Sequence, residues 1–274
     1  MLKNIILIVI LYLSTYGLGL AQSETLREGS ANPLLYAVAW KQTAAEYRAL
    51  FHQGFNVARF HLAEAIATHK PENKPLAVIT DVDDTILLST PYWGYLVTEG
   101  KDFFDDNAWD SWIRNNSTVA SPGALEFLRY CYANDVEVFY VTNRDQGPDT
   151  FSLALNNLST AGFPYADSEH LSVLRESSNK EAIQARLRDE YQVVLSLGDN
   201  LNDFARKYYV ADVDERIERM TDDRGLYGMQ YVLFPNPTDG HWIRAIFGES
   251  EPAPTDENRL KFKEAAVSTS WQSP

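Results

Sequence analysis

The sequence predicts an α/β fold: a doubly wound, Rossmann-like parallel sheet with a smaller, mainly helical cap. Two observations support the sheet. Four short apolar runs alternate with segments of helical periodicity, and buried parallel strands have this continuous apolar character. Each of the first three runs ends in polar residues, and ligands of doubly wound folds bind at the carboxyl ends of the strands. The runs cover residues 76–79, 136–141, 193–197 and 231–234.

The N-terminus, residues 1–21, has the layout of a secretory signal peptide. Lys3 is its only charged residue, an apolar run follows at 5–13, and small residues precede the expected cleavage near Ala21. The alternative is an uncleaved membrane anchor. Polar residues and a glycine at 14–17 interrupt the run before it reaches the about 20 residues that a bilayer requires. We therefore expect no membrane span and an exported protein, periplasmic or extracellular, that is soluble after signal cleavage.

Cysteine content and charge restrict the partners further. Cys131 is the only cysteine, so no intramolecular disulfide forms and no cysteine at the signal end accepts a lipid. The formal net charge of the chain is −14. Loss of the signal peptide removes the positive charge of Lys3 and makes the remaining chain more acidic. Such an acidic surface repels nucleic-acid polymers and anionic membranes. A small molecule remains the expected partner.

The remaining chain divides into a core and a cap. Apolar residues at helical spacing between 33 and 68 predict two amphipathic helices. The insertion after the first strand is rich in aromatic residues, and we expect it to cover the site. The predicted segments are 22–75 for the N-terminal part of the cap, 92–118 for the insertion, 76–91 and 119–248 for the core, and 249–274 for a polar C-terminal tail. Core helices are expected at 123–134, 151–161, 180–190 and 203–210.

Asp81 and Asp83 directly follow the first apolar run. Alternate residues of extended chain point the same way, so both carboxylates can face one pocket. One of them could attack phosphorus while the other transfers protons. Taken alone, this acidic turn is explained equally well by a solvated loop or a calcium-binding loop.

Three further motifs follow an apolar run or stand at the start of a predicted helix. Thr142 and Asn143 end the second run and offer donors for phosphoryl oxygens, although a helix cap is an alternative. Lys180 stands at a helix N-terminus, where the helix dipole does not favour a cation; a surface lysine is the alternative. Asp199 and Asp203 follow the third run and could hold and support a divalent cation, or Asp199 could cap a helix.

In combination, these motifs resemble the haloacid dehalogenase (HAD) superfamily of phosphohydrolases, and within it the class C bacterial acid phosphatases of the lipoprotein e family. The resemblance runs from about Trp40 to Phe247. Residues 81–85 and 198–204 resemble the two signature blocks of that family. Further matches are Trp-Asp-Ser-Trp at 109–112, Pro-Gly-Ala at 122–124, Phe-Tyr-Val-Thr-Asn-Arg at 139–144, and Pro235-Asn236 followed by Gly240 and Trp242.

The resemblance implies a magnesium-dependent acid phosphatase that forms an aspartyl-phosphate. It implies Asp81 as nucleophile and Asp83 as general acid and base. Mg²⁺ would be held by the carboxylates of Asp81 and Asp199 and the backbone carbonyl of Asp83. The remaining implied roles are phosphoryl binding by Thr142, Asn143 and Lys180, and support of the metal ligands by Asp203 and Thr85. Relatives also suggest a homodimer.

The expected substrate depends on two positions at which nucleotide-cleaving relatives have aromatic residues. Trp109 matches one of two aromatic residues with which nucleotide-cleaving relatives stack a base. Asp239 stands where those relatives have a tyrosine, and one lost stacking partner forfeits about 1–3 kcal/mol per base. We therefore expect phosphate monoesters in general as substrates, with 5′-nucleotides as a secondary expectation. A phosphotransferase, a non-catalytic cell-surface binding protein and a calcium-binding structural protein are the alternatives.

Overall fold

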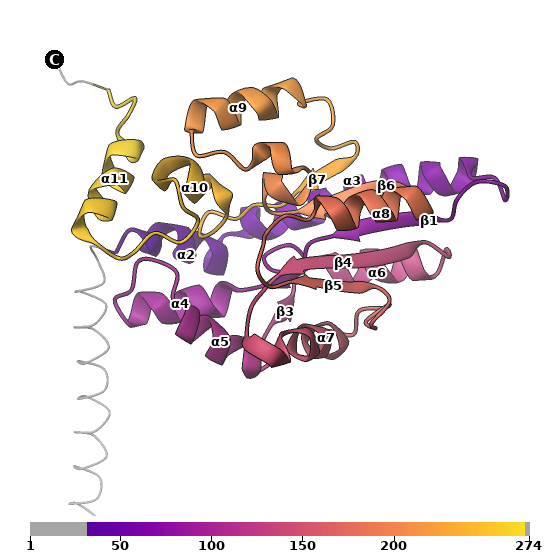
Figure 1. Cartoon of the computed structure of the whole chain (residues 1–274), viewed down its shortest axis with the longest axis horizontal. Coiled ribbons are helices and arrows are strands. Elements are labelled where there is room, and N and C mark those ends of the chain that lie inside the picture. The colour runs from indigo at the N-terminus through magenta and orange to yellow at the C-terminus, as the bar shows by residue number, and fades with distance from the viewer. Residues whose placement is uncertain (1–31, 272–274) are drawn as a thin grey trace, which may run out of the picture.

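A five-stranded parallel sheet forms the centre of the molecule. The computed structural model describes residues 32–271, so the predicted signal peptide lies outside the described residues. The strand order is β5-β4-β1-β6-β7, and all neighbouring pairs are parallel. Helices cover both faces of the sheet (Figure 1), which confirms the predicted α/β class. The strands are β1 (Leu76–Thr80), β4 (Glu137–Asn143), β5 (Leu171–Leu174), β6 (Gln192–Gly198) and β7 (Tyr231–Leu233).

Strand β1 lies in the middle of the sheet and carries the first acidic motif at its carboxyl end. All five of its residues are buried, which accounts for its continuous apolar sequence. The backbone N–H of Asp81 donates to the carbonyl of Leu197, so the chain beyond β1 stays bound to β6. The motif of Asp81 and Asp83 and the motif of Asp199 and Asp203 therefore emerge side by side.

Helices on the two faces come from different parts of the chain. Three of the predicted helices are present as α6 (Ala124–Tyr132), α7 (Thr150–Thr160) and α8 (Glu181–Glu190). Side chains of α6 and α7 pack in one cluster with Val78 and Val138, whereas Leu187 of α8 packs with Ile79 on the opposite face. Two further helices lie later in the chain: α9 (Val213–Asp222) comes between β6 and β7, and α10 (His241–Phe247) comes after β7.

The predicted helix at 203–210 is wrong. That region contains two 3₁₀ turns, Leu201–Asp203 and Arg206–Tyr208, separated by extended backbone at Ala205. The side chain of Asn200 accepts from the N–H of Asn202, and the Asp203 carboxylate accepts from the N–H of Asn200. This reciprocal capping closes a tight turn in place of a long helix.

The N-terminal segment that we assigned to the cap is divided between two layers. Helix α3 (Ala45–Thr68) buries Phe51, Phe55 and other apolar residues in the same cluster as β1 and therefore covers the sheet. Helix α2 (Leu34–Thr43) instead packs against α4 (Thr90–Thr98), where Val38 and Trp93 share a second cluster.

The insertion after β1 is helical and closed at its base. It contains α4 and α5 (Asp106–Arg114), and the short antiparallel strands β2 (Leu87–Leu88) and β3 (Val119–Ala120) join its two ends. Its aromatic side chains pack on one another, with Tyr92 in contact with Trp93, Phe104, Trp109 and Trp112.

The polar region from residue 249 contains a helix, α11 (Asp256–Ala266), that packs on α10. The guanidinium of Arg259 binds both carboxylate oxygens of Asp102, at 2.5 and 3.0 Å, and so links α11 to the insertion. Between residues 32 and 271, no helix has the length and apolar character needed to cross a membrane.

His170, next to β5, makes the stability of the fold depend on pH. Its Nδ1 lies 2.8 Å from Asp167 and its Nε2 lies 2.9 Å from Glu137. Burial lowers the pKa of His170, but the hydrogen bonds and charges of the two carboxylates outweigh burial and raise the pKa above 6.5. The folded state therefore binds the proton more tightly than the unfolded state.

We expect His170→Gln to lower the melting temperature most below pH 6.5, where the stabilisation from the raised pKa is fully present. The difference from wild type should shrink as the pH rises through the folded pKa of His170. Calorimetry between pH 5 and 9 measures this difference. A difference that stays constant over the whole range would contradict the assignment.

Candidate active site

Lys180 holds two carboxylates at the carboxyl edge of the sheet. It is buried at the start of α8, and its Nζ lies 2.5 Å from Asp81 Oδ1 and 2.7 Å from Asp203 Oδ1. A cation at a helix N-terminus is disfavoured by the helix dipole. The ion pairs with Asp81 and Asp203 offset this cost and stabilise the charged Lys180. Asp81 itself is only 9% exposed.

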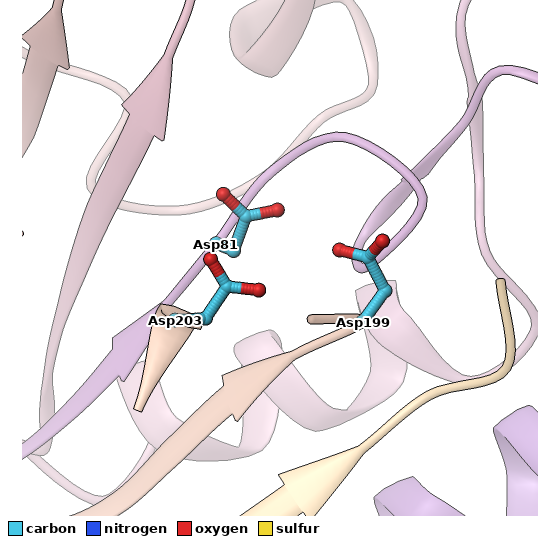
Figure 2. Close-up of side chains that lie close together, drawn as sticks. All are labelled: Asp81, Asp199 and Asp203. Carbon is cyan, nitrogen blue, oxygen red and sulfur yellow. The ribbon is translucent and has the colours of Figure 1, made fainter. Parts of the chain in front are cut away.

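Asp199 completes a cluster of three carboxylates. One carboxylate oxygen each from Asp81, Asp199 and Asp203 lies within 4.8 Å of the others, and Figure 2 shows the three groups side by side. The hydroxyl of Thr85 lies 3.2 Å from Asp81 Oδ2 and 3.0 Å from Asp199 Oδ1. Because a hydroxyl has a single hydrogen, Thr85 donates to one of the two at a time. Asn236 Nδ2 donates to Asp199 Oδ2 at 2.8 Å.

The cluster carries more negative than positive charge. Burial raises the pKa of Asp81 to about 6, although Lys180 opposes the shift. Burial and the charges of Asp203 and Asp81 raise the pKa of Asp199 well above its usual value. A divalent cation relieves such repulsion, and a donor set of carboxylate oxygens suits a hard cation such as Mg²⁺ or Ca²⁺. The residues present therefore fit a metal ion.

Gly198 allows this cluster to form. A Cβ atom at position 198 would lie 2.5 Å from the Cβ of Asp203, closer than real Cβ atoms approach. The absence of a side chain lets Asp203 fold back over the end of β6, where its Oδ2 accepts from the N–H of Asn200 at 3.0 Å.

Asp83 is held separately, by an arginine to which sequence reasoning gave no role. Arg144 Nε and Nη2 each lie 2.6 Å from an oxygen of Asp83, and Nη1 donates to Asn157 at 2.8 Å. The Thr142 hydroxyl is at the longer distance of 3.5 Å from Asp83. Burial raises the pKa of Asp83, and the Arg144 charge partly opposes that rise. The position of Arg144 directly after Thr142 and Asn143 was the available sequence signal.

Lys41 was also missed, because it comes from α2, far from every motif. Its Nζ lies 2.9 Å from Asp84 Oδ2, 2.8 Å from Thr238 Oγ1 and 3.3 Å from Asn236 Oδ1. Its side chain is fully buried. Because the Asn236 carbonyl oxygen accepts from Lys41, the amide nitrogen of Asn236 is turned toward Asp199. The backbone N–H and hydroxyl of Ser89 also donate to Asp84.

A cleft of about 160 Å³ joins these groups. Its lining includes every site residue predicted from the sequence except Thr85, namely Asp81, Asp83, Trp109, Thr142, Asn143, Lys180, Asp199 and Asp203. Thr85 joins the site through its hydrogen bonds. The Asn143 amide, oriented to donate, lies 2.9 and 2.8 Å from the carbonyls of Leu174 and Ser177, so its side chain braces the loop after β5.

The lining of the cleft also includes aromatic and acidic residues. Trp109 packs against Phe104, with ring centroids 5.6 Å apart, and both line the cleft. Asp239 lines it as well, and burial raises its pKa to about 6. His241 forms another part of the wall, and burial together with nearby cationic side chains lowers its pKa to about 3, which keeps the imidazole neutral in mildly acidic solution.

Two solved structures resemble the chain over most of its length. The class C acid phosphatase from Bacillus anthracis with tungstate bound has a TM-score of 0.79 and 29% identity, covering 90% of this chain and 99% of that chain. A second structure of the class C acid phosphatase from Bacillus anthracis has a TM-score of 0.76 and 29% identity, covering 88% and 97%. The predicted resemblance to class C acid phosphatases is thus confirmed.

Sequence comparison agrees with this likeness. Acid phosphatase 1 from Solanum lycopersicum is 28% identical over 134 residues, 46% of this chain, and the match spans 50% of the tomato protein's length. The family model of the HAD superfamily, subfamily IIIB (acid phosphatase), matches residues 19–242. This range contains Asp81, Lys180, Asp199 and the other site residues described above. The chain therefore belongs to the subfamily IIIB acid phosphatases of the HAD superfamily.

Proposed function

We propose that this protein is an exported, magnesium-dependent acid phosphatase that hydrolyses phosphate monoesters through a phosphoryl group on Asp81. The main support is the position of the Asp81 carboxylate, held by Lys180 within reach of a cation shared with Asp199. Family membership supports the reaction class. The signal-like N-terminus supports export.

Mg²⁺ would be held by the carboxylates of Asp81 and Asp199 and the backbone carbonyl of Asp83. Asp203 and Thr85 would support these ligands through the contacts described above. When bound, the cation supplies positive charge that reduces the repulsion between a carboxylate nucleophile and an anionic phosphate.

The first step is an in-line attack by an Asp81 carboxylate oxygen on phosphorus. The bond from phosphorus to the ester oxygen breaks, the oxygen leaves with the electron pair, and Asp83 transfers its proton to that oxygen. Arg144 binds both oxygens of Asp83 and so holds this carboxyl group in place. Lys180, Thr142 and the backbone at Asn143 bind the phosphoryl oxygens.

The second step hydrolyses the phosphoryl-aspartate. Asp83, now ionised, accepts a proton from water, and the water oxygen attacks phosphorus. The bond between phosphorus and the Asp81 oxygen breaks, which releases inorganic phosphate and restores the carboxylate. Tungstate, which is bound in the Bacillus anthracis relative, is a tetrahedral oxyanion like phosphate, and this supports binding of a phosphoryl group by a protein of this fold.

A panel of phosphate esters assayed with and without EDTA tests this proposal. We expect turnover of p-nitrophenyl phosphate at mildly acidic pH with Mg²⁺, and a fall of about 100-fold or more after chelation, because the charge stabilisation by the metal is lost. Release of inorganic phosphate is measured for each ester. A 5′-nucleotide in the panel tests the nucleotidase expectation that Trp109 supports.

EDTA already saturated with Mg²⁺ is the control, and it should leave the rate unchanged. Unchanged turnover after chelation would contradict the metal assignment. Absence of turnover with every ester would contradict the phosphatase assignment and favour a binding protein. Transfer of the phosphoryl group to an added alcohol faster than to water would identify a phosphotransferase.

A further inference from the structure

An apolar cavity of about 450 Å³ lies next to the candidate active site. Its walls come from α2, the insertion before α5, α10 and α11, and include Leu34, Trp93, Phe103, Ile246 and Phe262. Well-packed protein interiors contain few voids larger than a water molecule. A space of this size instead falls within the usual range of small-molecule sites. We call it the side cavity.

The side cavity adjoins the reaction cleft directly. Phe104, Asp239 and Ser250 line both spaces, so the cleft and the side cavity meet at these residues. The cleft, at about 160 Å³, is the smaller of the two spaces. The part of a larger ester that lies beside these shared residues can therefore extend into the side cavity.

The polarity and charge of the residues that line the side cavity determine which kind of chemical group it can hold. Asp102 and Asp239 are its two charged lining residues within the described chain, and no basic side chain lines it there. Asp102 is neutralised by its ion pair with Arg259 of α11. Carbon atoms from aromatic and aliphatic residues form most of the remaining surface. An anionic group is therefore disfavoured, whereas an apolar group gains from leaving water.

We propose that the side cavity receives the apolar alcohol portion of a phosphate monoester whose phosphoryl group reacts at Asp81. The inference rests on the proposed phosphatase function and adds a substrate class, namely aryl and medium-chain alkyl phosphates. In this proposal helix α11 contributes to substrate binding, because its residues Phe262 and Ala266 line the side cavity.

A series of n-alkyl phosphates from ethyl to hexyl tests the substrate class in the full chain. We expect kcat/KM to rise by up to about fourfold for each added methylene, the fold-change that corresponds to about 0.8 kcal/mol per buried methylene. Release of inorganic phosphate with Mg²⁺ present gives the rates. The ratio of the hexyl to the ethyl value is the readout, since both esters present the same reacting group.

Ala37→Phe places a bulky side chain in the side cavity, and Ala39→Phe is its matched control. Both residues lie on α2, but Ala37 lines the cavity whereas Ala39 is exposed and does not. We expect the hexyl-to-ethyl ratio to fall toward one in Ala37→Phe and to keep its wild-type value in Ala39→Phe. Ala266→Phe introduces the bulky side chain from α11 and repeats the test should Ala37→Phe fail to fold.

The outcomes separate this inference from the proposed function. A flat series in an active wild-type protein would overturn the substrate class and leave the phosphatase assignment intact; this result is also expected if another part of the chain or a second copy fills the cavity. Equal ratios in Ala37→Phe, Ala266→Phe and Ala39→Phe would overturn it as well. Absence of hydrolysis for every ester would contradict the proposed function and this inference together.

Discussion

Asp81→Asn is expected to lower kcat for p-nitrophenyl phosphate by about 10³-fold or more, as the loss of a nucleophile does in other enzymes. An amide is neutral and does not form the acyl phosphate that the mechanism requires. The substitution preserves the shape of the side chain, so the packing around β1 should persist. The kinetic measurement is made with saturating Mg²⁺ and is paired with a search for phosphorylated protein by mass spectrometry.

The fold should tolerate this change. Burial raises the pKa of Asp81, which means that its charged form is unfavourable in the folded state, and Lys180 keeps its contact with Asp203 in the variant. We expect the melting temperature to change little. Asp189→Asn, at an exposed position of α8, is the matched control with full activity. Wild-type kcat in Asp81→Asn would end the nucleophile assignment.

The second large effect is expected for Lys41→Met, which should lower the free energy of unfolding by about 3–5 kcal/mol. Methionine fills the space of the lysine stem but leaves Asp84 buried without its ion-pair partner. Thr238 and the carbonyl oxygen of Asn236 lose a donor at the same time. Urea denaturation measures the loss, and isothermal titration with Mg²⁺ tests whether Asn236 still orients Asp199.

Two comparisons make this prediction specific. Lys70→Met changes an exposed lysine on the loop after α3 and should leave the unfolding free energy within about 0.5 kcal/mol of wild type. The double variant Lys41→Met/Asp84→Asn removes both charges and should be more stable than Lys41→Met alone, because no uncompensated buried charge remains. A double variant less stable than the single one would show that the ion pair is not the source of the loss.

The sequence predicted the strands best where consecutive residues of a strand are buried. Strands β1, β4 and β6 were predictable because each is an apolar run that ends in chemically active residues, and the four motifs meet at the edge where those strands end. Strand β5 was missed because it is a four-residue edge strand, half-buried over most of its length. The helix predicted at 203–210 failed because Asp203 caps its own turn, a contact that periodicity does not report.

Two site residues show why the rest was out of reach. The sequence separation between Lys41 and Asp84 is 43 residues, and that between Lys41 and Thr238 is 197. A lysine in an amphipathic helix is normally solvated, and only the folded arrangement brings it into contact with these partners. Arg144 stood inside a recognised motif, yet its bidentate contact with Asp83 spans 61 residues and cannot be inferred from spacing.

The contact between Lys41 and Asn236 also means that the site is complete only when two distant segments of the chain are both present. During synthesis on the ribosome, 195 residues separate the two, so roughly 10 to 40 seconds pass between their emergence at typical elongation rates. Asp81 and Asp83 are made early in that interval, before β6, β7 and the amide that orients Asp199 exist. A nascent chain therefore carries the proposed nucleophile long before the site is complete, and the site forms only after the segment that contains Asn236 has been made.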